Sequence, residues 1–296
     1  MTVPASPNSE FERLAHVSRR LGRNVAYVQG GGGNTSIKID EGRMWVKASG
    51  TELAAAQTDN GFVAVDYERI RQGLATCTTE ADYTALVKAS ILEHNSERPG
   101  RPSIETGFHA LLPPATVLHS HSVLANVLTC AQEGEDLCRI LLPEAIWIPY
   151  ASPGLPVTAS IKDRLAAAGT ELQTVVLMLQ NHGIVVAAET PDAAWRLHED
   201  VNATILQHFD LAEPDLKTTP FFDADATHLL FPDQAVYLGH ESLRRSKAGE
   251  ETQQAYNFLR FVMDERHLTP DFLPSGEADF LLNMESEKYR QKVFAS

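Results

Sequence analysis

The chain has 296 residues, 43% of them hydrophobic and 22% charged, a composition typical of a globular protein and not of a disordered or fibrous one. Its 39 acidic and 25 basic residues give a net charge of -14, which repels nucleic-acid phosphates and anionic lipid head groups. We therefore expect a protein with no nucleic-acid or membrane partner.

Other features of the composition bear on where the protein works. The longest clean apolar run, residues 175–179, is far shorter than the roughly 20 residues that a membrane-spanning helix needs. Residues 1–10 are polar and lack the apolar segment of a secretory signal. The three cysteines, Cys77, Cys130 and Cys138, cannot form a disulfide framework. These features predict a cytoplasmic protein with reduced thiols.

The first hundred residues predict helices and a hairpin. Apolar residues at helical spacing from Phe11 to Leu21 predict a first helix, which ends at Gly22. The glycine loop, residues 30–33, is followed by alternating patterns that predict a hairpin with strands at 37–40 and 44–47. We then expect a strand at 62–66, a helix over 79–94, and a short helix from Ile104 that Ser103 caps.

The remaining elements alternate between strands and helices. Strands are expected at 116–120, 146–148, 174–180 and 184–187, and helices at 123–131, 160–168 and 191–208. Beyond residue 211 the pattern loosens, with helical stretches near 250–265 and 279–290. We expect an α/β fold with one sheet covered by helices, a catalytic domain at 1–210 and a helical C-terminal extension at 211–296.

Histidines are the first candidates for chemistry. His119 and His121 are two residues apart on a predicted strand, so both project to one face and can hold one metal ion. Alone the pair is weak evidence, because chance gives roughly 0.4 pairs of histidines two residues apart in a chain of this composition. His182, between two buried strands, can supply a third imidazole, or it can be a turn residue without a ligand role.

A glutamate and a glycine loop complete the candidate set. Glu105 begins a predicted helix, where it is either a catalytic carboxylate or a favourable anion in the first turn. The glycine loop lets successive N–H groups approach an anion, and Lys38 and Lys47 on the following hairpin suit a phosphate. The loop precedes a strand and not a helix, which excludes a dinucleotide-binding fingerprint.

Together these motifs resemble the class II aldolase/adducin family, of the fuculose- and rhamnulose-phosphate aldolase type. The resemblance covers residues 8–210. The sequence from Pro102 to Leu112 is especially similar to the aldolase half of bifunctional aldolase/short-chain dehydrogenase proteins. The motifs that carry it, in order, are Gly33-Asn34-Thr35-Ser36, Ala48-Ser49-Gly50-Thr51, Pro102-Ser103-Ile104-Glu105, His119-Ser120-His121 and Asn181-His182-Gly183.

The resemblance implies a three-layer αβα fold with a central, mostly antiparallel sheet. It implies that His119, His121 and His182 bind one Zn²⁺ per subunit, with Mn²⁺ or Co²⁺ as alternatives, and that Glu105 is the catalytic acid/base. We expect burial to raise the pKa of Glu105 when no metal is bound. The substrate phosphate is expected to contact Gly33, Asn34, Ser36, Lys47, Ser49, Gly50 and Ser103.

Some positions depart from the family pattern. Ile104 stands where the fuculose-type aldolases often have a second serine, and Lys47 replaces a small polar residue and adds a charge. A glutamate at 105 favours an aldolase over the family's epimerases, which have an aspartate there. The family also implies a homotetramer, with a tyrosine from a neighbouring subunit at the site, and the candidates are Tyr150, Tyr237, Tyr256 and Tyr289.

The resemblance implies a lyase of carbohydrate metabolism. This aldolase would reversibly cleave a ketose 1-phosphate, or a similar sugar phosphate, to dihydroxyacetone phosphate and an aldehyde through a zinc-stabilised enediolate. One alternative uses the same metal site for decarboxylation, dehydration or epimerisation of a phosphorylated sugar or sugar acid. A second alternative is a non-enzymatic scaffold of the adducin type.

Overall fold

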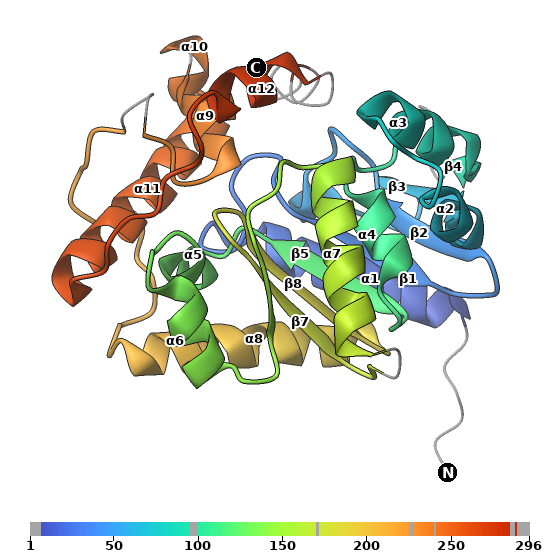
Figure 1. Cartoon of the computed structure of the whole chain (residues 1–296), viewed down its shortest axis with the longest axis horizontal. Coiled ribbons are helices and arrows are strands. Elements are labelled where there is room, and N and C mark those ends of the chain that lie inside the picture. The colour runs from blue at the N-terminus through green and yellow to red at the C-terminus, as the bar shows by residue number, and fades with distance from the viewer. Residues whose placement is uncertain are drawn as a thin grey trace.

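The computed structural model describes residues 7–94, 100–169, 172–224, 228–239, 241–284 and 288. Its centre is an eight-stranded sheet of order β4-β3-β2-β1-β5-β8-β7-β6, in which every pair is antiparallel except β6 with β7 (Figure 1). The strands are β1 (Asn34–Lys38), β2 (Arg43–Lys47), β3 (Phe62–Asp66), β4 (Ile91–His94), β5 (Thr116–Ser120), β6 (Ile146–Ile148), β7 (Val175–Leu179) and β8 (Gly183–Ala188).

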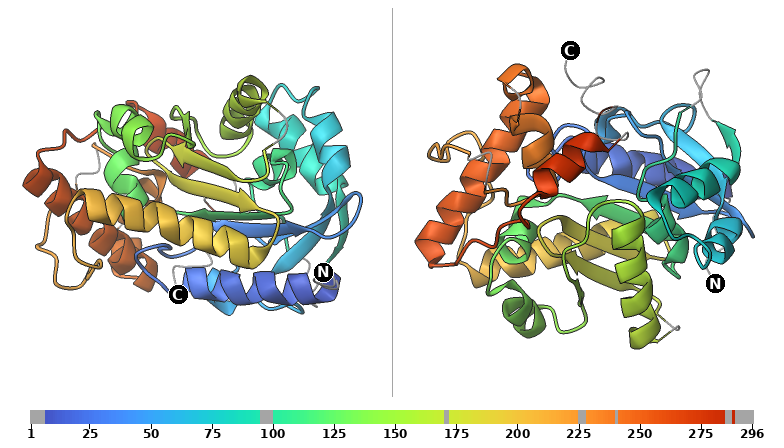
Figure 2. Two further views of the ribbon diagram at one scale, coloured as in Figure 1. Left: turned by 90° about the horizontal axis from the view of Figure 1, so that it is seen from below. Right: turned by 45° about the horizontal axis from the view of Figure 1, so that its top comes forward.

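Helices cover both faces of the sheet and make three layers. One face packs on α1 (Pro7–Gly22), α5 (Val123–Thr129) and α8 (Pro191–His208), and Figure 2 shows α1 and α8 side by side along it. The other face packs on α2 (Tyr67–Gly73), α3 (Glu80–Ala89), α4 (Thr106–Leu111) and α7 (Leu155–Ala168). The predicted α/β class, with three layers and a mostly antiparallel sheet, is confirmed.

Strand alternation decides which residues face the site. On β5, Leu118 packs in the α1 and α8 layer, whereas Val117 packs in the α4 and α7 layer. Because side chains two apart share a face of a strand, His119 lies on the same face as Val117. On β1, the residue directly opposite His119 is Asn34. The register of two central strands therefore fixes two of the predicted site residues next to each other.

The C-terminal residues form a separate group of helices at one end of the sheet (Figure 1). They are α9 (Pro232–Leu238), α10 (Glu241–Arg244), α11 (Lys247–Arg266) and α12 (Glu277–Asn283). Tyr256 and Leu259 on α11 join the same hydrophobic core as α5 and the sheet, while Tyr237 on α9 is fully buried. The C-terminal helices therefore pack against the rest of the protein and share its hydrophobic core.

Several predicted elements differ from those observed. The helix expected over 79–94 ends at Ala89, and residues 91–94 form β4 at the edge of the sheet. The short helix begins at Thr106, not at Ile104, and the Ser103 hydroxyl accepts from the backbone of Glu105 instead of capping the helix. Helices α2, α6 (Gly134–Leu141), α9 and α10 were not predicted.

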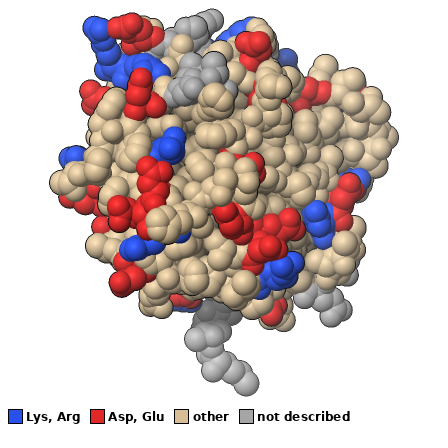
Figure 3. All heavy atoms as spheres, turned by 60° about the vertical axis from the view of Figure 1, so that its left-hand side comes forward, with Lys and Arg blue, Asp and Glu red and all other residues tan. Residues whose placement is uncertain are grey.

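Figure 3 shows one face of the molecule, on which acidic and basic side chains are intermixed without a continuous basic patch. The deficit of basic residues in the composition accounts for this pattern. Within the described ranges, every helix is too short or too polar to cross a membrane.

Candidate metal centre

Three histidines converge at one end of the central strands. His119 is the fourth residue of β5, His121 lies just past the end of that strand, and His182 lies in the tight turn between β7 and β8. All three are buried, and one nitrogen from each lies within 4.8 Å of those of the other two. The turn requires a left-handed backbone at Asn181, a residue type that tolerates it. The structure thus brings together the three histidines predicted from the sequence.

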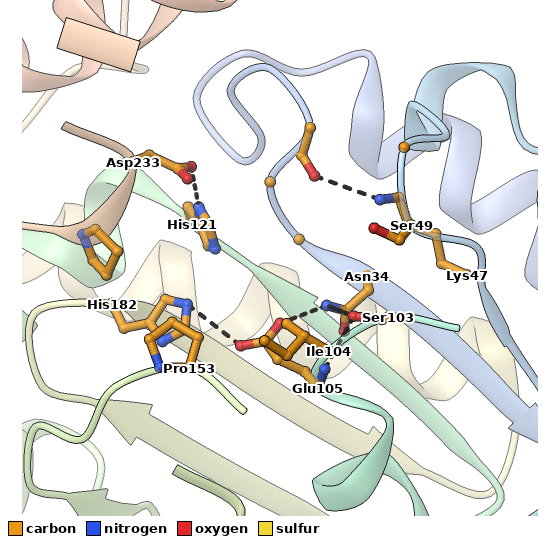
Figure 4. A pocket seen from close by; sticks show the side chains of 15 residues that line it. Asn34, Lys47, Ser49, Ser103, Ile104, Glu105, His121, Pro153, His182 and Asp233 are labelled. Atoms are coloured by element: carbon orange, nitrogen blue, oxygen red, sulfur yellow. Dashed lines mark hydrogen bonds and ion pairs between the residues drawn. The ribbon is translucent and has the colours of Figure 1, made fainter. Parts of the chain in front are cut away.

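Glu105 faces the histidines. Its Oε2 lies 3.6 Å from Nε2 of His119, and its Oε1 lies 3.5 Å from Nε2 of His182. The side chain makes no capping hydrogen bond to α4, although it occupies the position before the helix. Its carboxylate therefore points at the imidazoles, and the first-turn alternative does not describe its contacts (Figure 4).

A network behind the carboxylate fixes its orientation. The Asn34 amide donates to Oε2 of Glu105 at 2.6 Å and to Oγ of Ser103 at 3.1 Å. The amide oxygen of Asn34 is bonded in turn to His109, whose Nδ1 lies 2.7 Å from Oγ of Ser36. Because one end of the Asn34 amide is engaged by His109, its NH₂ group is directed at Glu105.

The donor set fits a divalent metal ion. Among the described residues, the buried atoms without a hydrogen-bond partner include Oε1 of Glu105, Nε2 of His119 and Nδ1 of His182. Buried polar atoms seldom lack partners unless an ion or water satisfies them. Three imidazoles are typical of a catalytic zinc site, in which the fourth position stays open to water or substrate.

The protonation states agree with that fit. Burial raises the pKa of Glu105, but the imidazoles of His119, His182 and His121 outweigh it and bring the pKa to about 2. The expected net rise is therefore wrong, since the neighbouring imidazoles favour the ionised carboxylate. Burial lowers the pKa of His119 and brings that of His182 to about 3, although Glu105 opposes both. Neutral imidazoles and an ionised carboxylate are the forms that bind metal.

A cavity opens beside the histidines and gathers most of the predicted phosphate residues. Its lining includes Glu105, His121 and His182 together with Gly33, Asn34, Lys47, Ser49, Gly50 and Ser103. Ile104 also lines it and offers no hydroxyl there.

Two predicted residues lie elsewhere. Ser36 is fully buried beneath α4 and bonded to His109, because it lies two residues along β1 from Asn34 and away from the cavity. Lys38 donates to the carbonyls of Leu112 and Pro114, and burial lowers its pKa to about 7.

The C-terminal helices supply site residues that the sequence did not reveal. Pro232 and Asp233 line the cavity, and Oδ2 of Asp233 lies 2.7 Å from Nδ1 of His121 (Figure 4). Nothing near Asp233 in the sequence marks it, since it follows a proline in the stretch where the pattern loosens.

The glycine loop is also bound by these helices. The N–H of Gly30 donates to Oε2 of Glu251 at 2.8 Å, and that of Gly31 donates to the hydroxyl of Tyr237 at 3.2 Å. At the first glycine of the loop, the N–H group is thus occupied by a carboxylate of the chain itself. Of the other candidate tyrosines, Tyr150 donates to Glu277, Tyr256 is buried on α11, and Tyr289 lies outside the described residues.

The fold and the cluster define the class of protein: a three-layer α/β protein with a buried centre of three histidines and a glutamate. The family model described as the Class II Aldolase and Adducin N-terminal domain matches residues 12–207 of this chain. The chain belongs to the class II aldolase and adducin family.

Relatives in this family differ in their reactions. The "uncharacterized oxidoreductase YuxG" of Bacillus subtilis is 30% identical over 194 residues, which are 62% of this chain and 27% of that protein. This chain thus corresponds to only a minor part of YuxG. A methylthioribulose-1-phosphate dehydratase of Microcystis aeruginosa is 24% identical over 185 residues, 56% of this chain and 78% of the dehydratase.

Solved structures show the same fold. The N-terminal class II aldolase domain of a conserved protein from Thermoplasma acidophilum is 22% identical, with a TM-score of 0.59 over 70% of this chain and 97% of that domain. YgbL from Klebsiella pneumoniae is 20% identical, with a TM-score of 0.51 over 72% of this chain and 94% of YgbL.

Proposed function

We propose that the protein is a metal-dependent lyase that reversibly cleaves a ketose 1-phosphate, or a similar sugar phosphate, to dihydroxyacetone phosphate and an aldehyde. The observation that carries this proposal is the carboxylate of Glu105, which is buried, free of any capping role, and held 3.5–3.6 Å from two imidazoles. His119, His121 and His182 would hold Zn²⁺, with Mn²⁺ or Co²⁺ as alternatives. When bound, the ion supplies a Lewis acid for the carbonyl and hydroxyl oxygens of the substrate.

Glu105 is proposed to move the proton. A carboxylate that faces the reacting end of the substrate can take a proton from the carbon or oxygen there and return it. Asn34 keeps the carboxylate turned toward the cavity through its hydrogen bond to Oε2. Glu105 also lines the cavity, so a proton that it takes from the substrate can exchange with solvent before one is returned.

The phosphate is proposed to bind on the opposite wall of the cavity. Lys47 supplies a charge there, while Ser49, Ser103 and the backbone of Gly33 and Gly50 supply hydrogen-bonding groups. Ile104 offers no hydroxyl to this wall, and Lys47 compensates with charge.

Dehydration of a sugar phosphate is a second candidate, and the similarity to the methylthioribulose-1-phosphate dehydratase favours it. It uses the same proton-removing carboxylate but expels water instead of breaking a carbon–carbon bond. Decarboxylation and epimerisation would use the site in the same way, whereas an adducin-like scaffold has no need for the converging ligands. By resemblance to its family we also propose a homotetramer, which sedimentation would test.

Proton exchange tests the function without knowledge of the aldehyde. The metal-loaded protein is incubated with dihydroxyacetone phosphate in heavy water, and loss of the hydroxymethyl proton signal is followed by NMR. We expect metal-dependent, stereospecific exchange, which Glu105→Gln lowers by at least about 100-fold because it removes the base. Glu68→Gln, on the exposed part of α2, is the matched control and should exchange at the unmodified rate.

Two outcomes would contradict the proposal. Unchanged exchange in Glu105→Gln would remove this carboxylate from the mechanism. No exchange by a protein that retains its metal would reject the donor, and product analysis with methylthioribulose 1-phosphate would then test dehydration.

A further inference from the structure

We propose that Asp233 is a positioning residue for the metal centre, which holds His121 in the tautomer and orientation that present Nε2 to a divalent cation. The inference deepens the proposed function and rests on it. Asp233 lies in the C-terminal helices, outside the residues 12–207 that define the family. The centre is thus completed by a segment of the same chain that the family domain does not contain.

The contact between the two side chains is direct and shielded from water. Oδ2 of Asp233 lies 2.7 Å from Nδ1 of His121, and the two side chains are only 1% and 7% exposed. A carboxylate accepts hydrogen bonds, so Nδ1 carries the proton and the lone pair stays on Nε2. A ligand histidine whose other nitrogen donates to a carboxylate is held in one tautomer and one ring orientation.

His119 shows why His121 needs such a partner. Nδ1 of His119 donates to the backbone carbonyl of Ile184 on the paired strand β8 at 3.0 Å. His121 lies beyond the end of β5, where the ladder with β8 has stopped. Asp233 therefore supplies to His121 the acceptor that the sheet supplies to His119.

The glycine loop is shaped to admit this contact. A Cβ added to Gly32 would lie 2.7 Å from Nδ1 of His121 and 3.0 Å from Oδ2 of Asp233. Any side chain at position 32 would push against both partners of the hydrogen bond.

The segment that carries Asp233 is fixed on both sides of the cavity. On one side Tyr237 and Glu251 accept from the glycine loop, as described above. On the other side the amide of Asn181, next to His182, donates to the carbonyls of Leu230 at 3.0 Å and Asp271 at 2.7 Å. The carboxylate is therefore held in place before a metal binds.

Metal affinity and imidazole tautomers test the inference. We expect Asp233→Ala to weaken Co²⁺ binding about 10- to 100-fold, measured by competition with a chromophoric chelator, and to alter the visible spectrum of the cobalt protein. Asp233→Asn retains an acceptor oxygen and should lose less affinity than Asp233→Ala. In ¹⁵N NMR spectra of the metal-free protein, we expect His121 as the Nδ1–H tautomer, with a mixture of tautomers in Asp233→Ala.

Glu277→Gln is the matched control. Glu277 also joins the C-terminal helices to the rest of the chain, by accepting from Tyr150 at 2.8 Å and Ser152 at 2.7 Å, but it touches no histidine. This variant should bind Co²⁺ as the unmodified protein does.

The outcomes separate this inference from the proposed function. Equal Co²⁺ affinity in Asp233→Ala and the unmodified protein, or an Nε2–H tautomer of His121 in the unmodified protein, would overturn the role of Asp233. Failure of the unmodified protein to bind any divalent metal would overturn the proposed function instead. If Asp233→Ala does not fold, the isosteric Asp233→Asn and the spectrum of the unmodified protein still decide.

Discussion

Lys47 is the only lysine whose side chain lines the described cavity, and it is 4% exposed. Its ammonium group lies 3.4 Å from the carbonyl of Gly31, so the charge is held at the wall proposed for phosphate. A hydrogen bond to a charged group contributes about 1.5–3 kcal/mol, or roughly 10- to 100-fold in an equilibrium constant. We therefore expect this residue to distinguish a phosphorylated substrate from an unphosphorylated one.

We expect Lys47→Met to lower kcat/KM for the phosphorylated substrate about 10- to 100-fold and to leave that for the unphosphorylated analogue nearly unchanged. Steady-state kinetics with both substrates measure the difference. Lys88→Met, on the exposed side of α3, serves as the control and should change neither value. An equal loss with both substrates would show that Lys47 does not contact the phosphate.

At this scale the sequence predicts the chemistry that is local to a motif. His119 and His121 share a strand face because side chains alternate, and this needs no knowledge of the fold. Glu105 and His182 were candidates by their positions, but only the family resemblance favoured a functional role over a structural one. Asp233 escaped prediction because its partner is 112 residues away in the sequence.

Among the elements, the glycine loop has the strictest backbone requirement. Gly33 adopts φ of 63°, and a Cβ there would lie 2.7 Å from the carbonyl oxygen of His119. The close approach brings β1 into its pairing with β5, where Asn34 lies opposite His119. Glycine at 33 is thus needed for strand pairing as well as for the cavity wall.

We expect Gly33→Ala to lower the free energy of unfolding by roughly 2–4 kcal/mol, since it adds a backbone clash to the strain of positive φ. Gly276→Ala isolates the second effect, because Gly276 has φ of 90° with nothing within 4 Å of an added Cβ. That control should lose only about 1–2 kcal/mol in urea unfolding. Equal losses in the two variants would mean that the chain relaxes around the His119 carbonyl.

Element prediction failed where neighbours decide the conformation. The helix α3 begins with a capping box between Thr79 and Asp82, a local signal, and its start was predicted correctly. Its end was not, because residues 91–94 gain hydrogen bonds to β3 that no local pattern reveals. The C-terminal helices were placed only coarsely for the same reason, since the strands and loops they contact lie far away in the chain.

For the whole molecule, buried histidines set the response to acid. His109 and His198 are fully buried, and burial brings the pKa of each to about 3, from an ordinary value of 6.5. The unfolded chain therefore binds more protons than the folded one between about pH 6.5 and 3. The stability associated with these groups is complete above pH 6.5 and is lost as the pH falls toward 3.

We expect the free energy of unfolding to fall steeply between pH 6.5 and 3, and His198→Gln to reduce the slope by up to one proton. Urea unfolding at a series of pH values measures it. His267→Asn is the control, because His267 is exposed and its left-handed backbone suits asparagine. An identical slope in His198→Gln and the unmodified protein would show that His198 does not contribute.

Gly32 carries a wider consequence. Its missing side chain makes room for the hydrogen bond between His121 and Asp233, two residues that are 112 positions apart in the sequence. The ring of His121 needs the same space, because its Nδ1 and Cε1 would lie 2.7 Å and 3.0 Å from an added Cβ. A segment exchanged into this chain must therefore keep glycine at position 32 if His121 and Asp233 are to keep their hydrogen bond.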